Sequence, residues 1–296
     1  MAGQVSIAVQ IGTPFDGAGM LAESLRKNRS LLKRLDVLVP KTRWYKGRLS
    51  ALAEELQGAP AAQEQLAELW VDSQVPDTGR RTILSDRNLI AAPQDIFQGG
   101  KFLPFADRRP AWLRRSLSAE AEVEYYFSLR NPASLIDAAL RHFKTSDLHG
   151  LTGGLDPFSI RWSDVILRLR EACPDTPLVL WMKEEQPYIW PQLMHRAAGL
   201  YGPVMTDGIA DGAARFLRPE IAVHLEAYLK KYDNYEPEFL ARAFERFTRK
   251  YAARDQTVEV IEVPGWTAQT VSQLTEAYMA DIQVISAISG VTILSA

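Results

Sequence analysis

Cysteine and histidine are scarce in this chain of 296 residues. The only cysteine is Cys173, and a single thiol excludes an internal disulfide and every metal site that needs several cysteines. The four histidines show no pair at the spacing of zinc ligands; they are His142, His149, His195 and His224. The sequence therefore predicts neither a disulfide nor a bound metal.

A long apolar run and an excess of one charge are also missing. No stretch of about 18 apolar residues occurs, so no membrane-spanning helix is expected. The first residues, MAGQVSIAVQ, lack the charged and apolar regions of a secretory signal, and we expect a cytoplasmic protein. The net charge of −2 argues against nucleic-acid binding, which needs a strongly basic face.

The composition that remains is that of an ordinary globular protein. Hydrophobic residues make up 47% of the chain and charged residues 24%. The chain contains no internal repeat, low-complexity segment or long linker. We therefore expect one domain that spans residues 1–296.

Short apolar runs alternate with amphipathic segments along most of the chain. The run at 5–11 predicts a buried strand, and leucines three or four positions apart predict a helix over 21–35. With a second apolar run at 36–40, these segments form a βαβ unit, which predicts a parallel sheet. Three more strands are expected at 81–85, 123–129 and 176–182.

Helices are expected between and after these strands, at 48–71 with a break at 58–60, and at 132–143, 162–172 and 190–200. Thr267 is expected to cap a last helix and Gly290 to end it. Residues 91–120 and 149–159 contain several glycines and prolines and are predicted to be irregular. The whole pattern predicts a three-layer α/β fold, with a largely parallel sheet of about five strands and helices on both faces.

The turn after the first strand has the glycine spacing of a phosphate-binding loop. In IGTPFDGAGML, residues 11–21, Gly12 and Gly17 fit G-x-x-x-x-G, a pattern whose backbone N–H groups surround a phosphate. The Lys and the Ser or Thr that complete the pattern are replaced by Ala18 and Gly19, so kinase chemistry is poorly supported. On spacing alone, an ordinary strand-to-helix turn is the alternative.

The sequence around this turn resembles the bacterial sulfotransferase-like proteins, which have a P-loop-type α/β fold. Their first loop runs I-G-T-H-K-T-G-T-T-x-L-Q, followed by A-N-R-x-x-L and a G-[IV]-x-x-P strand. Here IGTPFDGAGML, LRKNRSLL and DVLVP stand in the same register. RTILSDRNL and EYYFSLRNPASLIDAAL are similar to later strands of the family, and VPGWTAQTVSQLTEAYMADIQVISAISGV resembles a tail that recurs in one branch of it.

The resemblance implies a cofactor and the residues that bind it. The cofactor is the sulfate donor 3′-phosphoadenosine 5′-phosphosulfate (PAPS), whose 3′-phosphate is held by the arginine that Arg130 matches. The serine that assists this arginine in the family is Ala138 here, and Ser134 is the candidate replacement. The implied donor site comprises Gly12, Thr13, Pro14, Phe15, Asp16, Gly17, Ala18, Gly19, Arg130 and Ser134.

The function implied by the resemblance is transfer of a sulfuryl group to a hydroxyl of a small molecule or glycan. The loop lysine that stabilises charge on the sulfuryl group falls on Phe15, and Asp16 adds a carboxylate beside it. Removing one such charge-stabilising group typically slows an enzyme about 100- to 1000-fold. We therefore expect a sulfotransferase-like protein with altered or lost activity, and the alternative is a non-catalytic binding or interaction protein that retains the fold.

Other polar residues have alternative interpretations. Asp86 follows the third strand and is the candidate general base, whereas a helix N-cap or a solvated acid is its alternative role. Arg130 either captures an anion or forms a surface salt bridge. DRRPAWLRR at 107–115 either accepts a sulfated or phosphorylated ligand or forms a solvated face, and 181–185 line either an acceptor pocket or a charged strand exit. No serine stands in a G-x-S-x-G setting, so serine hydrolase chemistry is not supported.

Overall fold

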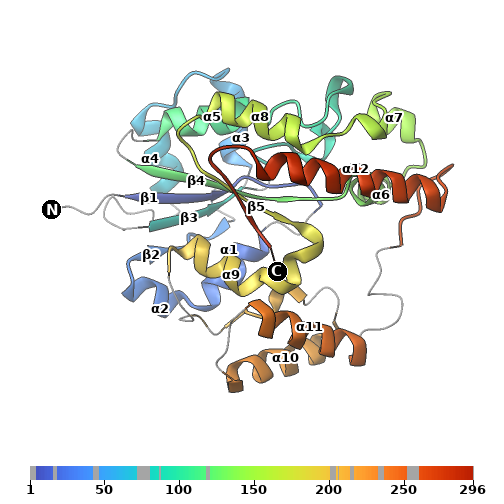
Figure 1. The fold of residues 1–296 in the computed structure, drawn as a ribbon. Coiled ribbons are helices and arrows are strands. Elements are labelled where there is room, and N and C mark those ends of the chain that lie inside the picture. The colour runs from blue at the N-terminus through green and yellow to red at the C-terminus, as the bar shows by residue number, and fades with distance from the viewer. Residues whose placement is uncertain are drawn as a thin grey trace.

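A sheet of six parallel strands runs through the middle of the computed structural model (Figure 1). Its strand order is β2-β3-β1-β4-β5-β6, and every pair of neighbours is parallel. The strands are β1 (Ser6–Gln10), β2 (Val37–Leu38), β3 (Arg81–Ser85), β4 (Glu122–Leu129), β5 (Leu178–Met182) and β6 (Val291–Leu294). The predicted parallel sheet is confirmed, with one strand more than the five expected.

The structure describes most of the chain. The described ranges are 5–15, 19–42, 47–71, 81–86, 88–117, 121–200, 205, 207–213, 217–232, 237–251 and 260–295. Three residues of the predicted donor loop, Asp16, Gly17 and Ala18, lie outside these ranges. Within them, none of the helices is long and apolar enough to cross a membrane.

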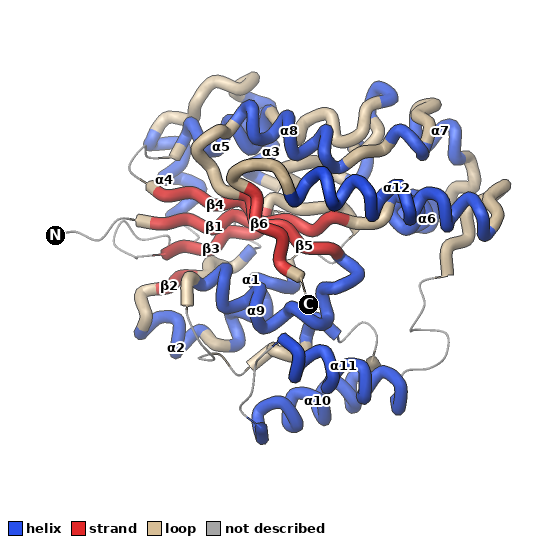
Figure 2. Tube along the Cα trace, viewed as in Figure 1, coloured by secondary structure: helices blue, strands red, loops and turns tan. Residues whose placement is uncertain are grey.

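Helices cover both faces of the sheet, which confirms the predicted three-layer α/β fold (Figure 1, Figure 2). The upper face in Figure 1 carries α3 (Arg48–Glu55), α4 (Gln63–Val71), α5 (Arg108–Ser116), α6 (Pro132–Phe143), α7 (Leu148–Thr152), α8 (Trp162–Ala172) and α12 (Ala268–Ser286). The lower face carries α1 (Met20–Lys27), α2 (Arg29–Arg34) and α9 (Gln186–Ala198). Beyond α9 lie α10 (Pro219–Tyr232) and α11 (Pro237–Tyr251), and α11 packs on α9.

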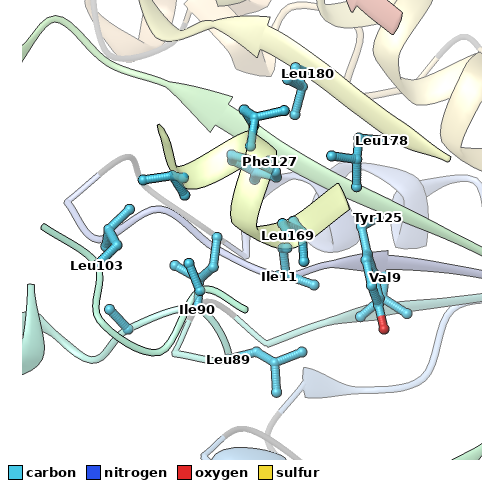
Figure 3. Packing of buried hydrophobic residues seen from close by; sticks show 14 of the residues in the cluster. Val9, Ile11, Leu89, Ile90, Leu103, Tyr125, Phe127, Leu169, Leu178 and Leu180 are labelled. Atoms are coloured by element: carbon cyan, nitrogen blue, oxygen red, sulfur yellow. The ribbon is translucent and has the colours of Figure 1, made fainter. Parts of the chain in front are cut away.

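Alternate residues of the strands point into two separate hydrophobic cores. Val9, Tyr125 and Leu180 face the upper helices, and Figure 3 shows them among the other side chains of that core. Val179 and Trp181 face the lower helices. Each fully buried Val, Leu, Ile or Phe side chain contributes about 1.5–3 kcal/mol to the stability of such a core. Because both faces are buried, the strands are nearly continuous apolar runs, and this is why the sequence predicts them well.

The prediction that residues 91–120 are irregular is wrong for α5, which occupies Arg108–Ser116. Pro110 is the third residue of this helix. The first four N–H groups of a helix have no intrahelical partner, so a proline there removes no helical hydrogen bond. The segment 149–159 likewise contains most of α7 and a 3₁₀ turn at Pro157–Ser159.

The helix expected over 21–35 is two helices, α1 and α2, which meet at Asn28. Asn28 Nδ2 donates hydrogen bonds to Ser24 O at 3.3 Å and to Asp207 O at 2.7 Å. The break is therefore held by a contact with a segment far along the chain, which helical periodicity does not report. The sequence pattern also predicts no element at α10, α11 or β6.

The last helix, α12, begins as predicted and ends earlier. Thr267 Oγ1 accepts a hydrogen bond from Thr270 N–H at 3.2 Å, which confirms the predicted cap. The helix ends at Ser286, before Gly290. The carbonyl of Gly290 instead accepts a hydrogen bond from Leu178 N–H at 2.9 Å, so this glycine leads into β6 beside β5.

Candidate functional site

The strand order places the carboxyl ends of β1 and β4 side by side, because the two strands are neighbours in the sheet. After β1 the chain turns to α1 on the lower face, and after β4 it turns to α6 on the upper face. Open parallel sheets bind their ligands where two neighbouring connections leave to opposite faces in this way. The loop after β1 and the residues after β4 therefore form the candidate ligand-binding site.

The backbone of the loop after β1 is bonded to β4 and to the segment that follows β3. Ile11 N–H donates to Tyr126 O at 3.0 Å, and Ile11 O accepts from Ile90 N–H at 3.0 Å. The buried hydroxyl of Thr13 donates to Ser128 O of β4 at 2.5 Å. Thr13, one of the predicted donor-binding residues, thus fixes the loop against β4.

Arg130 directly follows β4 and contacts this loop. Its Nη1 donates to Phe15 O at 3.0 Å, and its Nε donates to Ser134 Oγ at 2.9 Å. Its own carbonyl accepts a hydrogen bond from Trp162 Nε1 at 2.8 Å. Only 2% of Arg130 is exposed, so it is not a surface residue, and its role in anion capture stays a prediction. The structure thus brings together three of the predicted donor-site residues, Phe15, Arg130 and Ser134.

The N-terminus of α6 lies beside this arginine. Asn131 caps the helix, because its Oδ1 accepts a hydrogen bond from Ala133 N–H at 2.9 Å. Pro132 occupies the first helical position, where its fixed φ favours a helix start. The positive end of the helix dipole and the guanidinium of Arg130 together favour an anion at this point.

The ring of Phe15 packs against α6 and offers no charge to a ligand. The ring centroid lies 5.0 Å from that of His142 and 6.5 Å from that of Phe143, both on α6. The residue has a positive φ of 66°, which is unusual for a side chain of this size. Phe15 therefore contributes its backbone carbonyl to the site and an apolar contact to α6, but no cation.

Glycine is required at two positions of the loop. Gly12 has a φ of 106° and Gly19 a φ of 108°, values that other residues rarely adopt. Gly19 is also the residue that precedes α1. These two glycines thus shape the turn from β1 into α1, and Pro14 lies between them in the described part of the loop.

Asp86, the candidate general base, is fully buried at the end of β3. Its N–H donates to Gln10 O at 2.9 Å, and its Oδ1 accepts from Asn88 N–H at 3.1 Å. Nearby, Ser85 Oγ donates to Gln10 Oε1 at 2.9 Å and links the ends of β1 and β3. The alternative of a solvated acid is wrong, because no part of Asp86 reaches solvent, and its role as a base stays a prediction.

Sequence reasoning missed the contribution of α12 to this edge of the sheet. Glu184, just after β5, accepts hydrogen bonds from Asn131 N–H at 3.0 Å and from the Tyr278 hydroxyl at 3.3 Å. Asn131 Nδ2 also donates to Thr275 Oγ1 at 2.8 Å. Burial, together with the Glu184 carboxylate, raises the pKa of the Tyr278 phenol well above its usual value, so the phenol remains a donor. The sequence carries a signal for this contact, since Thr275 and Tyr278 stand three residues apart and so share one helix face.

The 181–185 segment contributes one more buried cation. Lys183 is 6% exposed, and its Nζ donates to Gln186 Oε1 at 2.7 Å. Trp181 Nε1 donates to the same oxygen, at 3.4 Å. Lys183 thus contacts the start of α9, and Glu184 contacts the start of α6, while the acceptor-pocket interpretation of 181–185 stays a prediction.

In the described ranges, no group of three or more His, Cys, Asp or Glu side chains is placed to hold a metal ion. Comparison of the chain with protein-family models, with curated proteins and with solved structures gives no match. The arrangement itself offers a buried arginine and a hydroxyl at a helix N-terminus, beside a glycine-bearing loop. Such an arrangement can bind an oxyanion, and it lacks a loop cation that would assist a group transfer.

Proposed function

We propose that the carboxyl edge of the sheet binds a 3′-phosphorylated adenine nucleotide, the class of ligand that sulfotransferases use, and that sulfuryl transfer by this chain is slow or lost. One observation carries the proposal. The guanidinium of Arg130 lies between the β1 loop and the hydroxyl of Ser134 at the start of α6. The resemblance to sulfotransferase-like proteins implies an arginine and a serine for the 3′-phosphate. That serine is Ala138 here, and Ser134, one helical turn nearer to Arg130, is its candidate replacement.

Burial strengthens the preference of Arg130 for an anion. A guanidinium in a low-dielectric setting interacts more strongly with charge than it would in water. Phe15 O and Ser134 Oγ, two of its acceptors, are neutral, and hydrogen bonds to charged acceptors are roughly twice as strong as those to neutral ones. Arg130 would therefore exchange the Phe15 carbonyl for a phosphate oxygen, with a small displacement of the loop.

The chemistry of transfer has less support than the binding. Phe15 stands where the family has its loop lysine, and its ring packs against α6. A transition state with charge on the sulfuryl group then lacks the cation expected to stabilise it, which typically costs about 100- to 1000-fold in rate. A non-catalytic protein that retains the fold is the second candidate. The hydrogen bond from Arg130 to the Phe15 carbonyl, in the loop after β1, favours this candidate.

The test is a thermal-shift titration with adenosine 3′,5′-bisphosphate. A ligand that binds only the folded state at 100 times its Kd stabilises it by about 2.7 kcal/mol, so the unfolding midpoint should rise by several degrees. The rise should be lost in Arg130→Gln and reduced in Ser134→Ala. Arg34→Ala, an exposed arginine on α2, is the matched control and should respond like the wild type. No rise at millimolar nucleotide, with the wild type folded, would refute the proposal.

A gain of activity tests the explanation for the missing transfer. Phe15→Lys, alone and combined with Ala18→Thr, should raise the rate of PAPS turnover at least about tenfold, because a cation is restored beside the reacting group. Release of adenosine 3′,5′-bisphosphate from PAPS, followed by chromatography, measures that rate. Nucleotide binding without any gain would support the non-catalytic alternative instead.

A further inference from the structure

A cavity of about 580 Å³ lies in the upper layer between the end of α3 and one face of α5. Pockets for small organic ligands typically measure about 300–1000 Å³. Its walls combine aromatic, small and charged residues, which are Ala53, Glu54, Gln57, Gly58, Phe105, Asp107, Arg108, Arg109, Ala111, Trp112, Arg115 and Ala172. None of them belongs to the strand-end site described above.

Four of the lining residues form one face of α5. Arg108, Ala111, Trp112 and Arg115 stand at i, i+3, i+4 and i+7, which is the spacing of a single helix face. The two arginines are thus two turns apart, about 10 Å along the helix axis. Their flexible side chains can converge on one anion above the alanine and the tryptophan between them.

The two carboxylates of the cavity are already neutralised. Glu54 forms an ion pair with Arg109, and Asp107 lies 3.2 Å from Arg168. Across the described residues, the Arg108 side chain has no hydrogen bond or ion pair, and Arg115 donates only to the Gly58 carbonyl, at 3.0 Å. The cavity therefore keeps an excess of positive charge at its rim.

The wall below these arginines is aromatic and contains a buried guanidinium. Arg109 is 5% exposed, and its guanidinium carbon lies 4.3 Å from the ring centroid of Phe105. Its Nε has no hydrogen-bond partner in the described part of the chain. The interpretation of 107–115 as a simple solvated face is wrong for Arg109. A buried donor that lacks a partner in a cavity wall is a feature that a bound acceptor would satisfy.

We propose that this α3–α5 cavity binds an aromatic oxyanion, namely an aryl ester of phosphate or sulfate. The tetrahedral oxyanion is held by Arg108 and Arg115 at the rim, and the aryl group lies in the part lined by Phe105 and Trp112. Arginine suits this task because its planar donors match the oxygens of phosphate and sulfate. The proposal is independent of nucleotide binding at the strand ends, since the two sites share no residue.

The experiment is isothermal titration of the full-length protein with 2-naphthyl phosphate, 2-naphthyl sulfate and uncharged 2-naphthol. Both esters should bind, and 2-naphthol should bind at least about tenfold more weakly, because it cannot use the guanidinium groups. Comparison of the two esters shows whether the site prefers phosphate or sulfate. The double variant Arg108→Gln/Arg115→Gln should weaken the esters at least about tenfold and leave the affinity for 2-naphthol unchanged.

Three controls locate the binding. Arg34→Gln removes an exposed arginine on α2, and Arg130→Lys alters the strand-end site; both should bind the esters like the wild type. Arg108→Lys retains a cation and should keep most of the affinity, provided that circular dichroism shows every variant folded. The proposal is overturned if neither ester binds at millimolar concentration, if 2-naphthol binds as tightly as the esters, or if the double variant keeps wild-type affinity. It is overturned too if Arg130→Lys abolishes ester binding, because the esters would then occupy the strand-end site.

Discussion

His195 on α9 uses both of its ring nitrogens in the folded protein. Its Nδ1 lies 2.7 Å from Pro191 O, and its Nε2 accepts a hydrogen bond from Met205 N–H at 3.2 Å. Nε2 must therefore be unprotonated, so the proton resides on Nδ1. Burial lowers the pKa of His195 below 6.5, although the hydrogen bond to Pro191 opposes the shift.

The lowered pKa of His195 predicts a loss of stability in mild acid. The neutral ring is favoured in the folded state, so its contribution is complete above the unfolded pKa of about 6.5 and is lost as pH falls below it. His195→Gln has no such titration, and its free energy of unfolding should fall less between about pH 7.5 and 5.5 than that of the wild type. Urea denaturation at a series of pH values measures both slopes. Equal slopes would show that His195 titrates alike in the folded and unfolded chains.

Glu124 on β4 is the centre of an ion network with Arg81 on β3 and Arg196 on α9. Its Oε2 lies 2.5 Å from Arg81 Nη2, and its Oε1 lies 2.6 Å from Arg196 Nη2. Burial alone would raise the pKa of the Glu124 carboxyl, but the hydrogen bonds and charges of Arg81 and Arg196 outweigh it and lower the pKa below 4.5. The ionised carboxylate is thus the form that the fold stabilises.

Replacing Glu124 by Gln should destabilise the protein by about 1–3 kcal/mol at pH 7, because two arginines lose their charged partner. For a lowered pKa, the contribution is present above the unfolded value near 4.5 and is lost as pH falls through the folded value. The difference in unfolding free energy between wild type and variant should therefore shrink in acid below about pH 4.5. A difference that is constant with pH would mean that the effect comes from packing rather than from charge.

At the scale of elements, α12 caps the start of α8 although Asp281 and Trp162 are 119 residues apart in the chain. Asp281 accepts hydrogen bonds from Trp162 N–H at 2.6 Å, from Ser163 N–H at 3.1 Å and from the Ser163 hydroxyl. A carboxylate at this place satisfies the free N–H groups of the first turn and interacts favourably with the helix dipole. The buried Asp281 thus joins α12 to α8 within the upper layer.

Asp281→Ala should lower the free energy of unfolding by about 2–4 kcal/mol, because buried donors at the start of α8 lose their acceptor. Asp164→Ala is the matched control: Asp164 is exposed in the first turn of the same helix and should cost about 0.5 kcal/mol or less. Chemical denaturation monitored by tryptophan fluorescence measures both variants. A loss at Asp281 no larger than that at Asp164 would contradict the role of α12.

The elements that sequence alone predicts well are those whose signal is local. The strands from β3 to β5 are apolar runs, and α6, α8 and the cap of α12 follow helical spacing or capping chemistry. The missed elements depend on distant parts of the chain. The break at Asn28 is held by the backbone at Asp207, and β6 exists because β5 offers an edge to pair with. The sequence does not predict α5 because a proline inside a helix normally breaks it, and nothing in the local pattern shows that the helix begins only two residues before Pro110.

The same distinction applies to the candidate site. The sequence placed Arg130 after a strand and Phe15 in the loop, and the parallel sheet brings the two into contact. It did not predict that Thr13 would be used to hold the loop to β4, or that Glu184 and α12 would close the neighbouring strand ends. These contacts join segments more than 50 residues apart, and only the folded chain defines them.

At the scale of the whole molecule, the sheet order explains where a ligand would bind. The connections that follow β1 and β4 leave toward opposite faces, so their first residues meet at the carboxyl edge of the sheet. Arg130, a buried cation after β4, donates a hydrogen bond to the loop that follows β1. The basic α3–α5 cavity lies apart from it in the upper layer, so the two anion sites that we propose can be tested separately.

The most direct measurement compares adenosine 3′,5′-bisphosphate with adenosine 5′-monophosphate by isothermal titration, on the wild type and on Arg130→Gln. These ligands differ only in the 3′-phosphate that Arg130 is proposed to hold. The wild type should prefer the bisphosphate by at least about tenfold, and the variant should bind both ligands equally weakly. Equal affinity of the wild type for the two ligands, or a preference that survives in Arg130→Gln, would contradict the account.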